Sequence, residues 1–208
     1  MRVLKLVGLV VVLSGALVSN AFATPITYID TGFGSGTIGA SSFFLERFTI
    51  RATGDTSARQ SFSQGFLIDN ISADITIEGL GNFTFVTPTL FFVNRVANGG
   101  VVGLARMNGV TLYSGPSNAQ FATWDMLTSI GPISGGGALN QWTNPPVITS
   151  GGALAFNTGN ALAATFQATV GSVATPVPEP GTLILFGSGL AGVVARFRRR
   201  RSTANISS

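Results

Sequence analysis

Between residues 24 and 175 the chain alternates short apolar runs with turn-forming residues, and no helical period lasts two turns. The strand-like runs include residues 43–50, 74–78, 82–85, 90–96 and 101–107. Gly and Asn separate them, and Asn108-Gly109 predicts a two-residue hairpin turn between 101–107 and 110–113. Many short strands without crossover helices predict an all-β domain, an antiparallel β-sandwich or jelly roll.

Two residue types are missing, and their absence restricts the chemistry of the chain. It contains no Cys and no His, so it has no Ser-His-Asp or Cys-His relay, no zinc site of the usual ligands and no disulfide. We therefore predict no metal site and no cofactor, and we do not expect an enzyme. Without disulfides the fold must be stabilised by its core, for which the 16 phenylalanines are the main candidates.

The net charge of +4 raises the question of nucleic-acid binding. The basic excess lies at the two ends of the chain, whereas residues 24–175 hold five arginines against seven acids. A nucleic-acid surface needs cations clustered on one folded face. We therefore predict that the protein does not bind nucleic acid.

Residues 1–23 have the three parts of a secretory signal peptide. Two cations precede an apolar run over residues 6–18, and small residues follow it. This run is shorter than the roughly 20 residues that span a bilayer, which favours a cleaved signal over a retained anchor. Ala21 and Ala23 form the predicted signal peptidase site, with the cut before Thr24 after export through the translocon.

The chain changes character again at residue 176. Pro176, Pro178 and Pro180 fix an extended linker, and the apolar, Gly-rich residues 182–195 follow. Fourteen helical residues span roughly 21 Å, so we predict a short transmembrane helix, for which membrane insertion is marginal. Its cytoplasmic end is marked by a cluster of arginines: Arg196, Arg198, Arg199, Arg200 and Arg201. Residues 24–175 are then predicted to lie outside the membrane and residues 202–208 to form a cytoplasmic tail.

The order of these parts is specific. Pro178-Glu179-Pro180-Gly181, the short apolar span and the arginine cluster together resemble the PEP-CTERM sorting signal of bacterial exported proteins, over residues 176–201. The resemblance implies recognition by an exosortase, a membrane-embedded, transpeptidase-like Cys enzyme, with cleavage near Pro178-Glu179-Pro180. It also implies a Gram-negative bacterium that makes exopolysaccharide, biofilm or a floc matrix. The tail after Arg201 is longer than is common in this family.

Two tryptophans in the middle of the chain are candidates for a glycan contact. Trp124 stands beside Asp125, and Trp142 beside Gln141. Carbohydrate sites stack a sugar on an aromatic ring and hold its hydroxyls with carboxylates or amides, whereas buried tryptophans of a β-domain serve only the core. Burial of both indoles would remove the stacking platform.

Two further sequence patterns are similar to binding motifs. The glycines of residues 34–39 match the dinucleotide pattern GxGxxG, but a strand-like run and no helix follows, so we interpret this segment as a flexible turn. The oxygen-bearing residues Asp69, Asn70, Asp74 and Glu78 lack the spacing of a calcium loop. Strand alternation places Asp74 and Glu78 on a solvent-facing side instead.

These observations favour an exported, non-enzymatic and structural β-domain. It would pass through a membrane-anchored intermediate on its way to the cell surface or extracellular matrix, where exopolysaccharide is a possible partner. A surface carbohydrate-binding module is the alternative. A glycan hydrolase or lyase would need two carboxylates about 5–10 Å apart in a cleft, and no motif points to such a pair.

Overall fold

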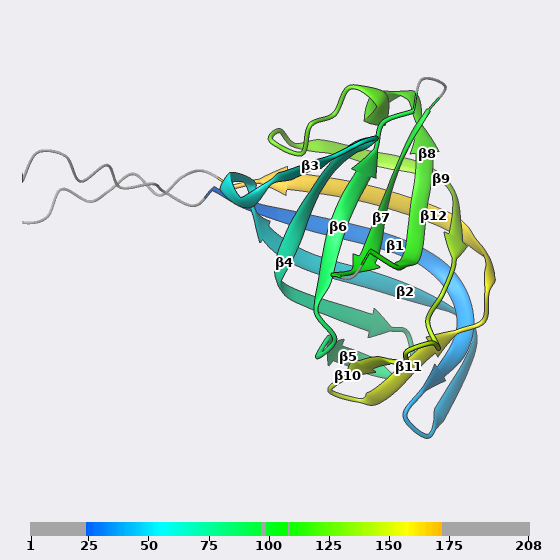
Figure 1. Cartoon of the computed structure of the whole chain (residues 1–208). Helices are drawn as coiled ribbons and strands as arrows, with labels where there is room; N and C mark the ends of the chain where they lie inside the picture. Colours follow the sequence, from blue (N-terminus) through cyan, green and yellow to red (C-terminus); the bar gives the residue numbers. More distant parts are fainter. Residues whose placement is uncertain (1–23, 97–98, 108, 172–208) are drawn as a thin grey trace, which may run out of the picture. The chain divides into compact units, whose positions relative to one another are not determined.

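The computed structural model describes residues 24–96, 99–107 and 109–171 of the chain. The chain divides into two units, residues 1–173 and 174–208, and all described residues belong to the first. They form twelve β-strands and two 3-10 helices, with no α-helix among them (Figure 1). The prediction of an all-β antiparallel domain is therefore confirmed.

The strands differ widely in length, from three residues to fifteen. In chain order they are β1 (Pro25–Ile38), β2 (Ser41–Asp55), β3 (Gln60–Phe62), β4 (Gly65–Ile77), β5 (Gly81–Thr84), β6 (Thr89–Asn94), β7 (Gly100–Arg106), β8 (Thr111–Asn118), β9 (Ile130–Leu139), β10 (Val147–Thr149), β11 (Gly152–Phe156) and β12 (Gly159–Val170). The 3-10 helix η2 (Thr56–Ala58) follows β2, and η3 (Ala119–Ala122) follows β8.

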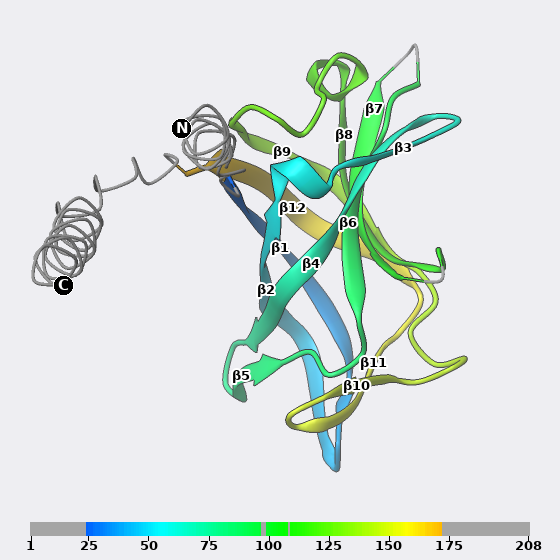
Figure 2. The same ribbon diagram turned by 60° about the vertical axis from the view of Figure 1, so that its left-hand side comes forward.

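Eight of these strands form one closed antiparallel barrel. Its order is β1-β12-β9-β8-β7-β6-β4-β2, and β2 pairs with β1 from Asp55 opposite Pro25 to Ser41 opposite Ile38. The predicted sandwich or jelly roll is not confirmed, because a single sheet closes on itself instead of two sheets packing face to face. Figure 2 shows the strands winding around a common interior.

Four short strands extend this barrel. β11 pairs with the end of β1 and with β10, while β3 and β5 pair with β4. β10 is held on its other side because the amides of Val86 and Thr87 both donate to the carbonyl of Ile148, at 2.9 and 3.0 Å. Both ends of the described domain meet, since the Gly171 amide donates to the Pro25 carbonyl at 2.8 Å.

Aromatic rings fill the interior, as the phenylalanine content predicted. Tyr28 stacks on Phe91 with ring centroids 4.5 Å apart, and Phe156 lies 5.0 Å from Phe48 and 4.9 Å from Trp142. Six phenylalanines are buried: Phe43, Phe48, Phe91, Phe121, Phe156 and Phe166. Rings from opposite walls thus meet across the barrel, and this packing stabilises it without disulfides.

The interpretation of residues 34–39 as a flexible turn is wrong for most of that segment. Gly34 and Gly36 lie within β1 at a bulge, and only Gly39 and Ala40 form the turn to β2. A Cβ at Gly34 would lie 2.9 Å from side-chain atoms of Phe156, and one at Gly36 would lie 2.1 Å from the Ala155 carbonyl oxygen. Glycine here allows β11 and the core rings to approach β1 closely.

The predicted hairpin is confirmed, but its turn is longer than the two residues expected, because the Arg106 amide donates to the Val110 carbonyl at 2.9 Å and residues 107–109 lie between them. β7 and β8 are antiparallel neighbours with Ala105 opposite Thr111, and the Gly109 amide donates to the Arg106 carbonyl at 2.8 Å. The other predicted runs also lie in strands, residues 74–77 in β4 and residues 90–94 in β6.

The predicted signal helix (1–23), the sorting segment (176–201) and the tail (202–208) lie outside the described residues. So does the predicted boundary of the exported domain at 175, since the description ends at Gly171. Within the described part of the chain, no helix has the length and hydropathy needed to cross a membrane.

Candidate functional site

Of the residues predicted to direct export, the structure describes Thr24 alone. Its carbonyl accepts hydrogen bonds from the Thr56 amide at 3.0 Å and the Thr56 hydroxyl at 3.1 Å, directly before β1 begins. A cut before Thr24 would therefore leave every strand intact. Ala21, Ala23, the sorting residues Pro178, Glu179, Pro180 and Gly181, and the arginines at 196 and 198–201 lie outside the described residues.

Both candidate glycan-contact tryptophans are buried. Trp124 is 5% exposed and its indole nitrogen donates to the Thr128 carbonyl at 2.8 Å, while Trp142 is 1% exposed against Phe156. Trp124 and Asp125 both line a surface hollow of about 450 Å³, but at 5% and 1% exposure neither indole presents the open ring face that stacking on a sugar needs. The structure therefore gives no support to the carbohydrate-binding alternative.

We expect this burial to be measurable in solution. Iodide, a charged quencher, should reduce the emission of Trp124 and Trp142 little in the native protein and strongly in urea, because neither indole reaches solvent. Added oligosaccharides should leave the emission spectrum unchanged. A native emission that iodide quenches as strongly as in urea would show that at least one ring is accessible.

The candidate calcium ligands form no cluster. Asp74 is half-buried on the outer side of β4 and accepts a hydrogen bond from the Thr84 hydroxyl at 2.7 Å. Glu78 is exposed and directly follows the strand. Ile75 and Ile77, on the opposite side of β4, point into the core. No group of three or more metal-ligating acids occurs in the described residues. Of the four surface hollows described, one is lined by a carboxylate, Asp125, and three by none.

One acid lies inside the barrel. Asp30 is 0% exposed on the inward face of β1, and neither of its carboxyl oxygens has a hydrogen-bond partner of good geometry. One oxygen approaches β8 so closely that a Cβ at Gly115 would lie 2.9 Å from it. Burial raises the pKa of Asp30 well above its ordinary value, and contacts with the Tyr113 hydroxyl and the Thr31 backbone lower it by less.

A buried arginine fixes the loop that carries Trp142. Arg106, at the end of β7, is 3% exposed and donates to the carbonyls of Trp142 and Pro146, at 3.2 Å each, and to that of Pro145. Three carbonyls of one loop thus converge on one guanidinium, which presents its donors in a rigid fork.

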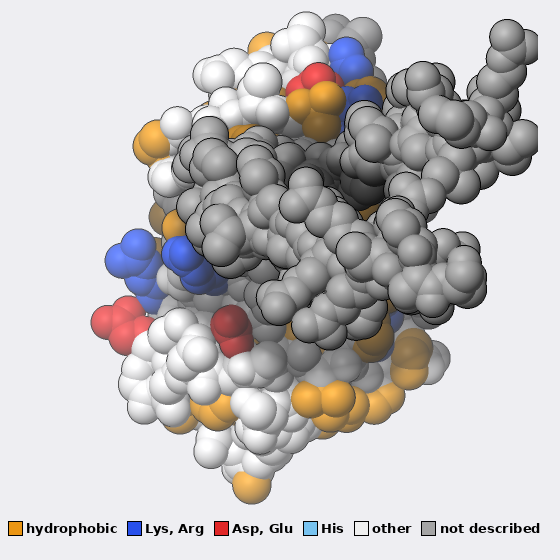
Figure 3. Space-filling view, turned by 90° about the vertical axis from the view of Figure 1, so that its left-hand side faces the viewer, with side chains coloured by type: hydrophobic (Ala, Val, Ile, Leu, Met, Phe, Trp, Pro, Cys, Tyr) orange, Lys and Arg blue, Asp and Glu red, His pale blue; other side chains and the backbone are white. Residues whose placement is uncertain are grey.

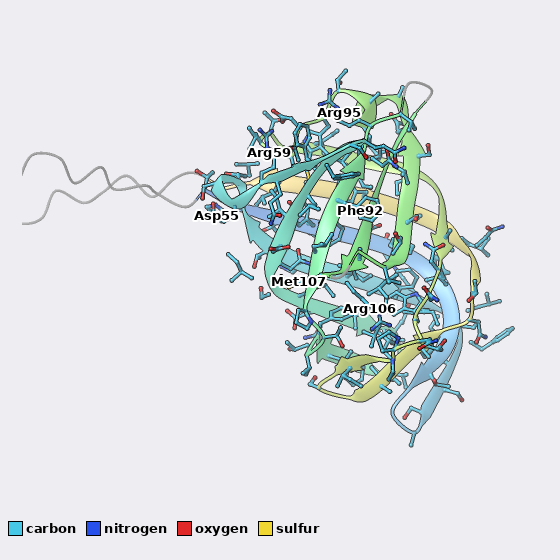
Figure 4. The ribbon with its side chains drawn as sticks, in the orientation of Figure 1. Asp55, Arg59, Phe92, Arg95, Arg106 and Met107 are labelled. Atoms are coloured by element: carbon cyan, nitrogen blue, oxygen red, sulfur yellow. The ribbon has the colours of Figure 1, made fainter. Side chains whose placement is uncertain are left out.

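The outer face of the barrel carries an apolar hollow between β4, β6, β7 and the β3 hairpin. Its volume is about 320 Å³. The apolar side chains that line it are Phe62, Leu67, Leu90, Phe92 and Ala105. Figure 4 shows Phe92 on this face, with Met107 below it. Phe62, which lines the hollow, is 37% exposed, so the hollow opens to solvent beside an uncovered ring. Met107 is 52% exposed but does not line the hollow.

A second hollow of about 360 Å³ lies next to the first, around the β3–β4 turn, and Phe62 lines both. Its charged member is Arg95, and Ser61, Ser63 and Gln64 supply polar groups. We call it the cationic hollow. Phe66 lies beneath two guanidinium groups, with Arg59 at 4.3 Å and Arg95 at 5.4 Å from the ring centroid. Figure 4 shows both arginines at the same end of the molecule.

The two arginines differ in their pairing. Arg59 forms an ion pair with Asp125, with 3.6 Å between nitrogen and oxygen. Arg95 donates from Nε to the Ala122 carbonyl at 2.8 Å but has no acidic partner among the described residues. In the coloured part of Figure 3, the charged side chains form a few separate groups. Arg95 is therefore a cation without an acidic partner among the described residues, and the paired Arg59 lies over the same Phe66 ring.

Comparisons with known proteins identify the end of the chain. Residues 176–200 match the family model for the PEP-CTERM protein-sorting motif, which confirms the resemblance seen in the sequence. The chain thus carries a PEP-CTERM sorting signal at residues 176–200, and this motif supports export followed by processing by an exosortase at the membrane. No curated protein and no solved structure matches the chain.

Proposed function

We propose that the β-domain is a non-catalytic, structural component of the cell surface or extracellular matrix of a Gram-negative bacterium, associated with exopolysaccharide or biofilm. The sorting motif at residues 176–200 is the observation that carries this proposal, because it directs an exported protein to an exosortase. A membrane-anchored intermediate precedes the final location, with the signal peptide removed and the arginine cluster on the cytoplasmic side.

The fold supports a structural role. The barrel interior is filled by packed rings, and the described hollows contain no pair of carboxylates that would serve hydrolysis. The first and last strands of the barrel, β1 and β12, pair with each other, with Ile26 opposite Val170. Cleavage of the segments before β1 and after β12 would therefore leave this pairing in place. A closed domain of this kind suits a protein displayed outside the cell.

Intact-mass measurement of the protein in cell fractions tests the proposal. We expect the surface or matrix fraction to hold a product that begins at Thr24 and has lost the segment after the motif near Pro178-Glu179-Pro180. A strain without the exosortase should retain a membrane-bound form that keeps its C-terminal segment. The double substitution Pro178→Ala with Glu179→Ala should reproduce that retention, whereas Thr175→Ala, just outside the motif, should not.

Full-length protein in the cytosol, or identical products with and without the exosortase, would contradict this account. Protease added to spheroplasts gives an independent result, because residues 24–171 should be digested from outside.

A further inference from the structure

Strand β6 is apolar on both of its faces. Phe91 and Val93 point into the core, and Leu90 and Phe92 point outward to the apolar hollow. The outer face of an antiparallel sheet that contacts water normally carries polar side chains at these positions. The apolar outer surface continues onto the two neighbouring strands, because Phe92 lies opposite Leu67 of β4 and Leu90 lies opposite Ala105 of β7. Leu90 and Ala105 are already nearly covered, at 5% and 2% exposed, so the apolar surface still open to a ligand is that of Phe62, Leu67 and Phe92.

The cationic hollow continues this surface toward the β3–β4 turn. Phe62 lines both hollows, and the Asn94 amide of the first donates to the Gln64 side chain of the second at 3.0 Å. Arg95 itself is fixed by two bonds, from its amide to the Gln64 carbonyl at 2.7 Å and from Nε to Ala122. Its terminal nitrogens form no hydrogen bond within the described residues and so remain available to an anion, and its guanidinium carbon lies 5.4 Å from the centroid of the Phe66 ring.

We propose that the two hollows together bind a fatty acid, with its chain on the apolar hollow and its carboxylate at Arg95. This inference goes beyond the proposed function and does not depend on it. Charge complementarity selects the head group, because Arg95 is an unpaired cation at one end of an apolar groove. A dense polyanion is disfavoured, since Arg95 is the one cation among the described residues that line these two hollows, and residues 24–175 hold seven acids against five arginines.

Photo-crosslinking of the full-length chain in nanodiscs of zwitterionic phosphatidylcholine tests this site. The probe is laurate with a diazirine on its alkyl chain, and the labelled peptides are identified by mass spectrometry. We expect labels to concentrate in residues 62–67, 90–94 and 105–107. Arg95→Gln should lower laurate labelling about tenfold, because a charge-assisted bond to the carboxylate is lost. Phe92→Ser should lower it as well by removing the central apolar contact.

Two matched controls separate recognition from general stickiness. Arg47→Gln removes the same charge from an exposed position on β2 and should leave the labelling unchanged. Photoreactive dodecanol, which has the chain without the carboxylate, should label wild type weakly and be insensitive to Arg95→Gln. Circular dichroism of each variant confirms that the barrel is folded. Labelling that is equal in wild type and Arg95→Gln, that is spread over the surface, or that links the groove to residues 182–195 or a second copy would overturn the proposal.

Discussion

Asp30→Asn should stabilise the protein at neutral pH by about 2–4 kcal/mol, although it changes a single buried atom. The wild-type carboxyl lies in the core without a well-formed hydrogen bond, and burial raises its pKa well above the ordinary value of 3.8. In the unfolded chain Asp30 gives up its proton near that ordinary value, whereas in the barrel it keeps it. The stability due to the neutral carboxyl is thus complete below about pH 4 and falls as pH rises toward the raised pKa.

Urea denaturation at several pH values measures this effect. The free energy of unfolding of wild type should decrease by up to about 1.4 kcal/mol per pH unit above pH 5, and that of Asp30→Asn should stay level. The titrations of Tyr113 and Asp55 do not interfere with this measurement. Burial raises the pKa of Tyr113 out of this range, and the bond from the Ser57 amide lowers the pKa of Asp55, whose contribution is lost only at more acidic pH. Parallel pH profiles for the two proteins would show that Asp30 is not the titrating group.

The position of Asp30 illustrates what the sequence can predict and what it cannot. Ile26, Tyr28 and Asp30 alternate along β1, so strand periodicity alone places all three on one face. A charged residue nevertheless indicates a solvent-facing side by default, because ionised groups are costly to bury. Only the closure of the barrel reveals that this face is the interior. Closure depends on β1 pairing with both β2 and β12, and β12 lies more than a hundred residues away in the sequence.

The same limit applies to the outer hollows. The run at residues 90–96 is visibly apolar in the sequence, yet such a run is equally typical of a strand covered on both sides in a sandwich. Phe66 and Arg95 are neighbours only because β4 pairs with β6, with Gly65 opposite Asn94. Sorting signals behave differently. Their information is carried by contiguous residues, so the motif at residues 176–200 could be recognised without any knowledge of the fold.

Arg106→Ala should be among the most damaging single substitutions, with a loss of about 3–5 kcal/mol in the free energy of unfolding. The guanidinium donates to three carbonyls of the Trp142–Pro146 loop, and no other described side chain is placed to replace it. Its loss leaves those carbonyls without their donor and releases Trp142 from Phe156, so tryptophan emission should shift to longer wavelength before global unfolding.

Two matched variants separate the fork of donors from the charge. Arg106→Lys keeps the positive charge but cannot reach all three carbonyls in the same geometry, so it should recover only part of the lost stability. Arg47→Ala removes an exposed arginine from β2 and should change stability by less than about 0.5 kcal/mol. If Arg106→Lys were as stable as wild type, the charge alone would account for the effect. If Arg106→Ala matched Arg47→Ala, the loop would be held by its apolar packing, with the Trp142–Phe156 contact as the main anchor.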